Sequence, residues 1–385
     1  MPNLTAAPRA LALMRRFMPL LHLRDRIGTM FLAALALCFP WPSALAGTGV
    51  LLSEREVKEI VAPLFNRHEV KGLAVGLLSP SGRAVYGYGL IKGTRGPAPS
   101  GRTVFEIGSI TKTFTGVLLA MAQMEGKLDL TDPVSRYLPS DVAGPESPFS
   151  GMAILDLATH SSGLPERPDN MPSADPLNPF AGYDLPLFYD FLRRFTPSRP
   201  VGARFEYSNA GAALAGLILS RVYGKPYEEL VRDKICAPLG MLETRITLPD
   251  SMKRAYAPGH NQALTRVPAW EVPVFEAAGA LRSTPDDLLT YAAANLGLAE
   301  TPLLSPMLLS HIPRFHVAEI PELFIGLFWN AYNFKGHRYV MHAGRSGGFF
   351  ALIMLDPARK TGVVLLSNAE GDLTKYGWNI LEKLR

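Results

Sequence analysis

A serine and a lysine stand three residues apart, at Ser109 and Lys112, where an apolar run begins. On a helix this spacing places the hydroxyl and the amine on one face, about one turn apart. A buried lysine amine beside a serine can help to take the hydroxyl proton, which a nucleophilic serine without a histidine partner requires. The pair alone indicates little, because on the order of one or two Ser-x-x-Lys pairs arise by chance in such a chain.

The residues after Ser109 have the periodicity of a helix. Apolar side chains recur with helical spacing between residues 110 and 125, and Gly126 is a natural helix stop. We therefore expect Ser109 at a helix N-terminus, where the positive end of the helix dipole favours a developing alkoxide.

The rest of the chain predicts strands at both ends and helices between them. Strands are expected at 73–78, 84–88, 338–342, 349–355 and 362–367, the first two as a hairpin. Helices are expected after the capping box at Ser53 and Glu56, at 210–223, 226–235 and 285–296, and at the C-terminus. The proline-rich segment 164–200 is expected to be a long irregular functional loop. The pattern predicts an α+β fold, with a central antiparallel sheet flanked by helices as an α/β/α sandwich and an inserted, mostly helical lobe.

The first 46 residues predict a secretory signal peptide. Five arginines precede an apolar run from Met30 to Phe39, and an Ala-x-Ala signal ends at Ala46. The run is too short to span a bilayer, so we expect a periplasmic or secreted mature chain, residues 47–385, without a stable membrane span. Cleavage removes five Arg and one Asp and lowers the net charge from +5 to +1. A nucleic-acid partner is therefore not indicated.

Only Cys236 remains after cleavage, so the mature chain has no internal disulfide, and we expect this thiol to be a buried small hydrophobe. No histidine pair has ligand spacing and no phosphate-binding glycine loop is present, so no metal or cofactor is expected.

Two further motifs follow the Ser-Lys pair in order. Tyr207-Ser208-Asn209 lies 98 residues after Ser109, and His342-Ala343-Gly344 lies 135 residues after Tyr207. This order of Ser-x-x-Lys, Tyr-x-Asn and Lys/His-x-Gly resembles the class C β-lactamase and DD-peptidase family of serine hydrolases, which also holds esterases and D-amino-acid peptidases. Five further segments are similar to landmarks of that family: 105–108, 157–165, 238–241, 279–285 and 326–329.

The resemblance implies a β-lactamase/transpeptidase-like fold, with a sheet lobe at about 47–108 and 270–385 and a helical lobe at about 109–269. It implies an acyl-enzyme on Ser109. Lys112, desolvated between the lobes, would have a lowered pKa and would accept or relay the proton. Tyr207, held partly as phenolate by the nearby ammonium, would act as general base and then as acid.

The resemblance also implies the supporting groups. Asn209 would orient Lys112 and bind a substrate amide, and His342 and Gly344 would border the site. The oxyanion hole would consist of the backbone N–H groups of Ser109 and Arg345. Arg345 would either bind a substrate carboxylate or point to solvent. The third motif departs from most class C β-lactamases, which carry Lys in place of His342.

The predicted function is that of a monomeric serine hydrolase of β-lactamase or D-alanyl-D-alanine carboxypeptidase type, acting on β-lactam or D-amino-acid peptide amide bonds. The alternatives are a carboxylesterase on small esters and a penicillin-binding sensor that acylates without turnover. We expect substrate preference to depend on the segment 165–200 and on Trp329 and Tyr332.

Three other residues of interest receive structural interpretations. Ser346 lies in a Gly-x-Ser-x-Gly pattern, but no histidine follows residue 342 to complete a nucleophile elbow, so we expect a strand-connecting turn. Glu166 imitates the glutamate loop of class A β-lactamases, but it precedes the second motif. His160, in a landmark segment, is expected to be structural.

Overall fold

The computed structural model describes residues 50–92, 96–144, 146–172, 175, 177–334 and 336–384. The expected signal peptide, residues 1–46, lies outside the described residues. None of the helices in the described ranges combines the length and the apolarity that a bilayer crossing needs.

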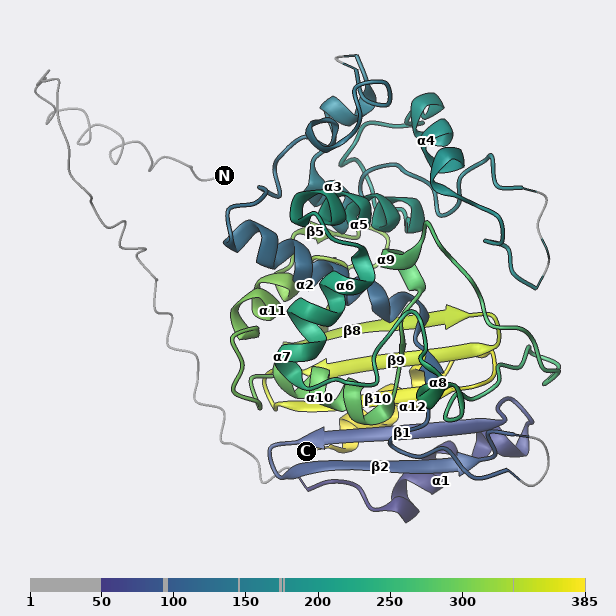
Figure 1. The fold of residues 1–385 in the computed structure, drawn as a ribbon. Coiled ribbons are helices and arrows are strands. Elements are labelled where there is room, and N and C mark those ends of the chain that lie inside the picture. Colours follow the sequence, from purple (N-terminus) through teal and green to yellow (C-terminus); the bar gives the residue numbers. More distant parts are fainter. Residues whose placement is uncertain are drawn as a thin grey trace, which may run out of the picture. The chain divides into compact units, whose positions relative to one another are not determined.

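One eight-stranded antiparallel sheet forms the centre of the fold (Figure 1). Its spatial order is β2-β1-β10-β9-β8-β7-β6-β5, so strands from the two ends of the chain are neighbours. The strands are β1 (Gly72–Ser79), β2 (Gly82–Gly89), β5 (Phe315–His316), β6 (Leu323–Ile325), β7 (Asn330–Phe334), β8 (His337–Ser346), β9 (Phe349–Asp356) and β10 (Thr361–Ser367). The N-terminal hairpin and the three C-terminal strands expected from the sequence are confirmed. The short strands β5 to β7 gave no clear sequence pattern.

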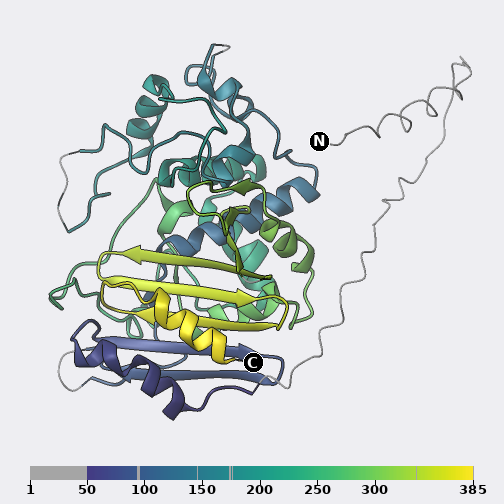
Figure 2. The same cartoon turned by 180° about the vertical axis from the view of Figure 1, so that it is seen from behind.

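Helices cover both faces of this sheet. The helices α1 (Glu54–Asn66) and α12 (Thr374–Lys383) lie against one face, as the view from behind shows (Figure 2). The helix α10 (Pro285–Asn295) packs on the other face. Strands β1, β9 and β10 are buried at every position, because both of their faces are covered. The sheet and its covering helices confirm the expected α+β sandwich.

The capping signals read from the sequence are present in the structure. Ser53 and Glu56 form the capping box of α1, each side chain bonding the other's backbone N–H. The Thr284 side chain accepts from the N–H of Asp287 at the start of α10. These local bonds explain why both helices begin where the sequence predicts.

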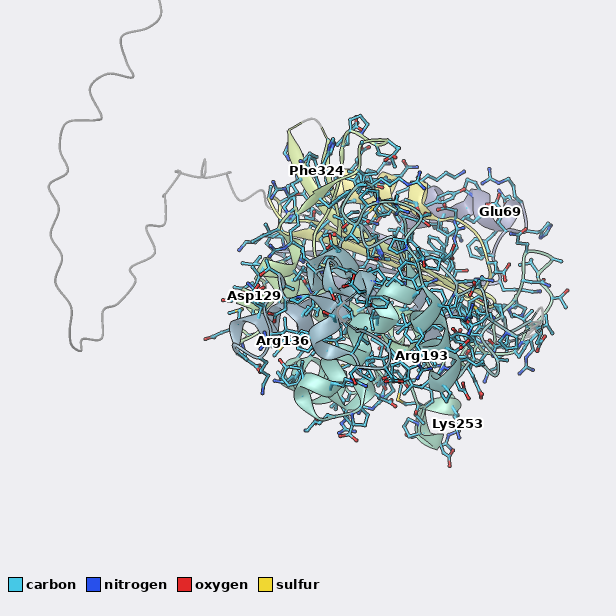
Figure 3. All side chains as sticks on the ribbon, turned by 90° about the horizontal axis from the view of Figure 1, so that it is seen from above. Glu69, Asp129, Arg136, Arg193, Lys253 and Phe324 are labelled. Atoms are coloured by element: carbon cyan, nitrogen blue, oxygen red, sulfur yellow. The ribbon has the colours of Figure 1, made fainter. Side chains whose placement is uncertain are left out.

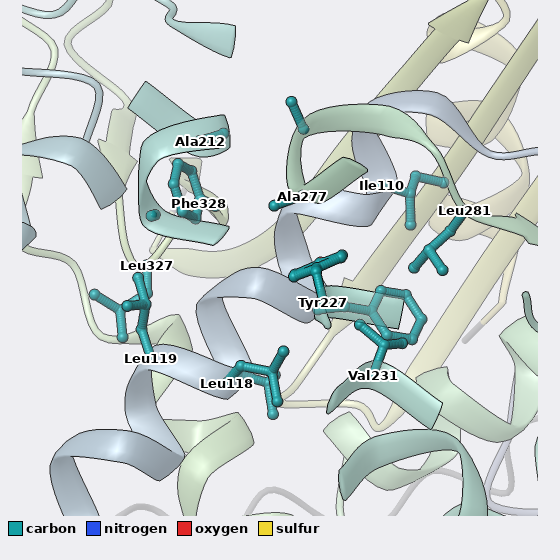
Figure 4. Close-up of a cluster of buried hydrophobic side chains, with 14 of the residues drawn as sticks. Ile110, Leu118, Leu119, Ala212, Tyr227, Val231, Ala277, Leu281, Leu327 and Phe328 are labelled. Carbon is teal, nitrogen blue, oxygen red and sulfur yellow. The ribbon is translucent and has the colours of Figure 1, made fainter. Parts of the chain in front are cut away.

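A second group of helices occupies the middle of the chain around α2. The helices are α2 (Thr111–Met124), α3 (Ile154–Ala158), α4 (Leu185–Arg194), α5 (Asn209–Tyr223), α6 (Tyr227–Val231), α7 (Ala237–Leu239), α8 (Asp250–Lys253), α9 (Glu276–Gly279) and α11 (Leu304–His311). Figure 4 shows part of the core around α2, with Leu118 near Tyr227 and Val231 of α6 and Leu119 near Leu327. Since eleven of its fourteen residues are buried, α2 is enclosed on nearly all sides.

Two glycines allow α2 and α5 to lie close to neighbouring segments of the chain. A Cβ at Gly116 of α2 would lie 2.0 Å from the carbonyl oxygen of Leu327, and one at Gly216 of α5 would lie 2.3 Å from the Cβ of Ala277. Real Cβ atoms do not come that close, so these two glycines allow α2 and α5 to pack where they do.

The structure corrects two expectations. The segment 164–200 is not wholly irregular, because it contains α4, whose N-terminus is capped by the Asp184 side chain and whose apolar face buries Phe188, Phe191 and Leu192. The helix expected at 226–235 is α6 followed by a π-helical turn, Arg232–Cys236.

Charged side chains lie on the outside of this core. Figure 3 labels five exposed charged residues at the periphery: Glu69, Asp129, Arg136, Arg193 and Lys253. Exposed pairs such as Arg193 with Asp141 contribute about 0–1 kcal/mol each. The stability of the fold therefore depends on its apolar core.

Candidate active site

Ser109 lies in a short turn that a small second sheet holds in place. The strands β3 (Phe105–Glu106) and β4 (Arg282–Ser283) pair antiparallel. The next residue, Ile107, donates its N–H to the carbonyl of Leu281 at 3.0 Å. The chain then forms the 3₁₀ turn η1 (Gly108–Ile110), which contains Ser109, and continues directly into α2. Ser109 thus precedes α2 by two residues, and Lys112 is the second residue of that helix.

The structure brings the predicted serine, lysine, tyrosine and asparagine into one hydrogen-bonded cluster. The Ser109 Oγ lies 2.9 Å from the Lys112 Nζ and 2.6 Å from the Tyr207 hydroxyl. The Lys112 Nζ also donates to the Asn209 Oδ1 and to the Ala278 carbonyl, each at 2.7 Å. Lys112 of α2 and Tyr207, two residues before α5, therefore meet at the Ser109 hydroxyl, while Asn209 and the α9 backbone hold the lysine amine.

The Lys112 amine is held by acceptors but is poorly solvated. Burial lowers its pKa to about 7, against a weaker opposing effect of the Glu166 carboxylate. The Asn209 and Ala278 oxygens can only accept, so they occupy two of its N–H bonds. The third contact, to Ser109, is an N–H donation in the ammonium, whereas in the neutral amine it joins a lone pair to the serine O–H. Near pH 7 the amine can therefore accept the serine proton.

Tyr207 differs from the expectation that it is partly phenolate. Burial raises the pKa of its hydroxyl above the ordinary value, and the hydrogen bond with Ser109 opposes this effect without cancelling it. The Lys112 Nζ lies 4.8 Å from the centre of the tyrosine ring. Because that amine is itself only partly charged near pH 7, it does not offset the loss of water around the phenol. Tyr207 is therefore a phenol, a proton donor, in the resting site.

The end of β8 touches the serine turn through two glycines. A Cβ at Gly344 would lie 1.9 Å from the Ile107 carbonyl oxygen and 2.9 Å from the Ser109 nitrogen. Gly108 has φ +48°, and a Cβ there would lie 2.7 Å from the Arg345 nitrogen. The backbones of Ser109 and Arg345, the expected oxyanion donors, are therefore brought together by segments in direct contact.

His342 lies within β8 and carries no charge near neutral pH. Its Nδ1 lies 2.7 Å from the Ala343 carbonyl oxygen, which can only accept, so Nδ1 carries the proton. Burial, helped by the nearby Lys112, lowers the pKa of the imidazole to about 3. The site thus has a neutral ring where most class C β-lactamases have a lysine.

The Arg345 side chain is largely exposed to solvent and forms an ion pair. Its guanidinium lies 2.9 Å from the Asp372 carboxylate in a pair whose side chains are 65% and 59% exposed. The cation beside the serine is therefore already paired with an anion, although in an exposed and weak ion pair.

A small pocket opens beside Ser109, and its wall corrects the expectation about substrate preference. Among the described residues it is lined by Ser109, Phe180, Asn209, Trp270, Val272, Phe275, Ala278, Gly279 and Arg345. Trp329 is fully buried between Tyr291 and His311, and Tyr332 packs against Trp378, so neither belongs to the wall. Phe180 does come from the segment 165–200. Trp270 had no motif to mark it in the sequence.

Trp270 is fixed in this wall by two features. Its indole N–H donates to the Leu177 carbonyl at 2.8 Å. A Cβ at Gly347 would lie 2.2 Å from the indole nitrogen, so the ring packs directly on the turn after β8. The aromatic wall and the strand that ends beside the serine therefore support each other.

Two residues that were set aside in the sequence, Ser346 and Cys236, take no part in this hydrogen-bonded cluster. Ser346 is the last residue of β8, and its buried hydroxyl has no hydrogen-bond partner in the described chain. Cys236 is buried, and burial raises the pKa of its thiol to about 12. Neither residue has the activated state of a nucleophile.

Comparison with known proteins defines the class. The fold matches solved class C beta-lactamases, one with a TM-score of 0.76 at 24% identity over 86% of this chain and 95% of that one. It also matches a D-alanine carboxypeptidase AmpC from Burkholderia cenocepacia, with a TM-score of 0.75 at 24% identity over 86% of this chain and 98% of that one. The chain thus has the fold of the class C beta-lactamases.

The family assignment comes from the sequence comparisons. The Beta-lactamase family pattern matches residues 57–382. A beta-lactamase of Providencia stuartii is 33% identical over 274 residues, 70% of this chain and 66% of that protein. One of Lysobacter lactamgenus is 25% identical over 349 residues, 82% of this chain and 87% of that protein. The chain belongs to the beta-lactamase family, and the protein is a serine hydrolase.

The contact between Gly344 and the serine turn gives a prediction. In Gly344→Ala the added methyl group must displace Ile107 or Ser109, so we expect a loss of about 1–3 kcal/mol in the free energy of unfolding. Reaction of Ser109 with a fluorophosphonate probe should also slow. Gly151→Ala is the control, because φ is −100° there and a Cβ would meet nothing within 4 Å. Urea unfolding measures the stability of both variants, and a gel assay measures their labelling. Equal stability and equal labelling of the two variants would contradict this account.

Proposed function

We propose that this chain acts as a periplasmic or secreted serine hydrolase that forms an acyl-enzyme on Ser109, on β-lactam or D-amino-acid peptide amide bonds. The observation that carries the proposal is the position of the Ser109 hydroxyl, 2.9 Å from a buried amine and 2.6 Å from a half-buried phenol. The names of the relatives, beta-lactamases and a D-alanine carboxypeptidase, support this substrate class. In this proposal the signal peptide is residues 1–46, and the mature protein is a monomer, with a sheet lobe at about 47–108 and 270–385 and a helical lobe at about 109–269.

Acylation begins with proton transfer from Ser109 to the neutral amine of Lys112 as Oγ attacks the carbonyl carbon. The backbone N–H groups of Ser109 and Arg345 bind the oxyanion. Tyr207 then donates its proton to the leaving nitrogen, and the ester on Ser109 forms as the amide bond breaks. The resulting phenolate is stabilised by the ammonium of Lys112. Asn209 keeps that ammonium in place and binds the substrate amide.

Deacylation reverses the proton transfers. The Tyr207 phenolate takes a proton from water, and the hydroxide attacks the ester carbonyl. Ser109 leaves and recovers its proton from the Lys112 ammonium. Each group then has the protonation state with which it began, so the cycle needs no other acid or base.

Direct observation of the adduct tests the nucleophile. With a fluorescent penicillin, the mature protein should gain the mass of one penicillin, and Ser109→Ala should gain none, because no other activated hydroxyl lies in the cluster. Intact mass is followed over time. Loss of the adduct with turnover indicates a hydrolase, and a persistent adduct indicates the non-turnover sensor. No adduct on the mature protein removes the β-lactam branch, and unchanged hydrolysis by Ser109→Ala overturns the mechanism.

The lowered pKa of Lys112 predicts the acid side of the pH profile. Below pH 7 the ammonium uses all three N–H bonds and cannot accept the serine proton, so the acylation rate should rise with pH through about 7 and then level off. Lys112→Arg, which is always charged, should be about 10²-fold slower or more at every pH. Stopped-flow acylation between pH 5 and 9 measures this, with the exposed Lys253→Arg as control. An acylation rate that stays constant between pH 5 and 9 contradicts the role of Lys112.

A second candidate function, hydrolysis of small esters, is favoured by the charges beside the serine. A substrate carboxylate meets a neutral imidazole at His342 and a guanidinium already paired with Asp372. Uncharged esters need no such partner. Hydrolysis of p-nitrophenyl butyrate faster than that of nitrocefin or a D-Ala-D-Ala peptide would favour this candidate over the first.

His342→Lys tests whether the neutral ring sets this preference. A lysine there adds a cation, so kcat/KM for a substrate with a free carboxylate should rise about tenfold relative to its carboxamide analogue. His342→Gln keeps the position neutral and should leave the ratio unchanged. An unchanged ratio in His342→Lys, with Tm within a few degrees of the parent, shows that substrate charge is recognised elsewhere.

A further inference from the structure

His160 has a backbone conformation that usually belongs to glycine. It follows the C-cap of α3 with φ +58°. Its N–H bonds the Leu157 carbonyl at 3.3 Å, and the N–H of Ser161 bonds the Asp156 carbonyl at 3.0 Å. These two bonds form a Schellman motif, in which glycine normally takes the left-handed position. A residue with a Cβ is strained there, so its side chain must offset the strain through contacts.

The contacts of His160 surround Tyr207. The N–H of Glu206 donates to the His160 carbonyl at 2.7 Å, and the N–H of Ser208 donates to its Nδ1 at 3.1 Å. The two rings lie 4.7 Å apart, with an angle of 39° between their planes. One residue therefore holds the backbone on both sides of Tyr207 and also packs against its ring.

The His160 ring is locked in one tautomer. Because Nδ1 accepts from Ser208, the neutral ring carries its proton on Nε2, and no lone pair remains for another proton. Nε2 is buried without a nitrogen or oxygen partner among the described residues. The ring centres of Phe205 and Phe328 lie 5.8 and 5.3 Å from the centre of the His160 ring. Phe328 is labelled in Figure 4. The ring is thus a fixed, uncharged support.

We propose that His160 is the positioning residue for Tyr207, and that its ring and carbonyl hold the phenol 2.6 Å from Ser109, where it can donate its proton to the leaving nitrogen in the proposed mechanism. This inference rests on the proposed function, because it gives the phenol its role in that reaction. The His160 side chain does not contact Ser109, so its effect on the reaction passes through Tyr207. A glycine in this place would relieve the strain and leave Tyr207 without either the ring contact or the Nδ1 acceptor.

Two substitutions separate the parts of this support. His160→Phe keeps a ring of similar size but removes the acceptor for Ser208. His160→Asn tolerates the left-handed conformation and retains an acceptor, Oδ1, at the position of Nδ1. We expect acylation of Ser109 by a fluorescent penicillin, whose leaving nitrogen takes its proton from Tyr207, to slow 10–100-fold per folded molecule in His160→Phe. His160→Asn should recover at least half of that loss on a logarithmic scale.

The decisive measurement combines His160→Phe with Tyr207→Phe. If His160 acts through the phenol, it should matter little once the hydroxyl is gone, so the double variant should be less than about threefold slower than Tyr207→Phe alone. His311→Phe is the matched control, because it removes the hydrogen bond of another buried histidine, to Asn295, outside the cluster. Its labelling per folded molecule should equal that of the parent.

Each outcome bears on a different statement. Parent-like labelling of His160→Phe, or an equal loss with and without the Tyr207 hydroxyl, overturns the positioning role. A matching loss in His311→Phe also overturns it, because the effect is then one of general destabilisation. Labelling of Ser109→Ala at the parent rate instead shows that the proposed nucleophile is wrong, whatever the His160 variants do.

Discussion

The active site depends on one buried amine. Lys112 is fully buried, and its amine contacts the oxygens of Ser109, Asn209 and Ala278. The loss of water around the amine lowers its pKa to about 7. An exposed lysine would keep its proton and would be useless as a base at neutral pH. The Glu166 carboxylate opposes this fall in the pKa, and the Asn209 and Ala278 oxygens hold the amine in place through hydrogen bonds. The elements around the site must therefore exclude water without removing these two oxygens.

Close backbone packing is how the fold achieves this. Gly116 lets α2 approach the Leu327 carbonyl, and Gly108 and Gly344 let the serine turn rest directly on β8. A Cβ at Gly116, Gly108 or Gly344 would lie 2.0, 2.6 or 1.9 Å from a neighbouring backbone oxygen, so the layers would have to separate. Water would then reach the amine, and the serine would move away from the strand. The same glycines thus serve both packing and electrostatics, which are not separable at this site.

The sequence predicted the groups that carry chemistry better than the groups that hold them. Ser109, Lys112 and Tyr207 fall in motifs, the capping signals located the starts of α1 and α10, and the strand and turn signals located β1, β2 and β8 to β10. The sequence could not predict that the Ala278 carbonyl accepts from Lys112, because every residue has a carbonyl and only the fold determines which one faces the amine. Trp270 was missed for a related reason, since its place follows from a contact with a distant glycine. The state of Tyr207 was misjudged because burial, which opposes the phenolate, has no local signature.

The buried bases around Ser109 also constrain one another. Burial lowers the pKa of both His160 and His342, and the charge of Lys112 lowers each further. Of these three groups, Lys112 keeps the highest pKa, so a proton that enters the cluster resides there. In the proposed mechanism that proton is the one taken from Ser109, and it faces the Tyr207 phenolate. Because both imidazoles are neutral, they add no positive charge that would stabilise the Tyr207 phenolate. The phenolate therefore takes up a proton more readily, which favours completion of the cycle.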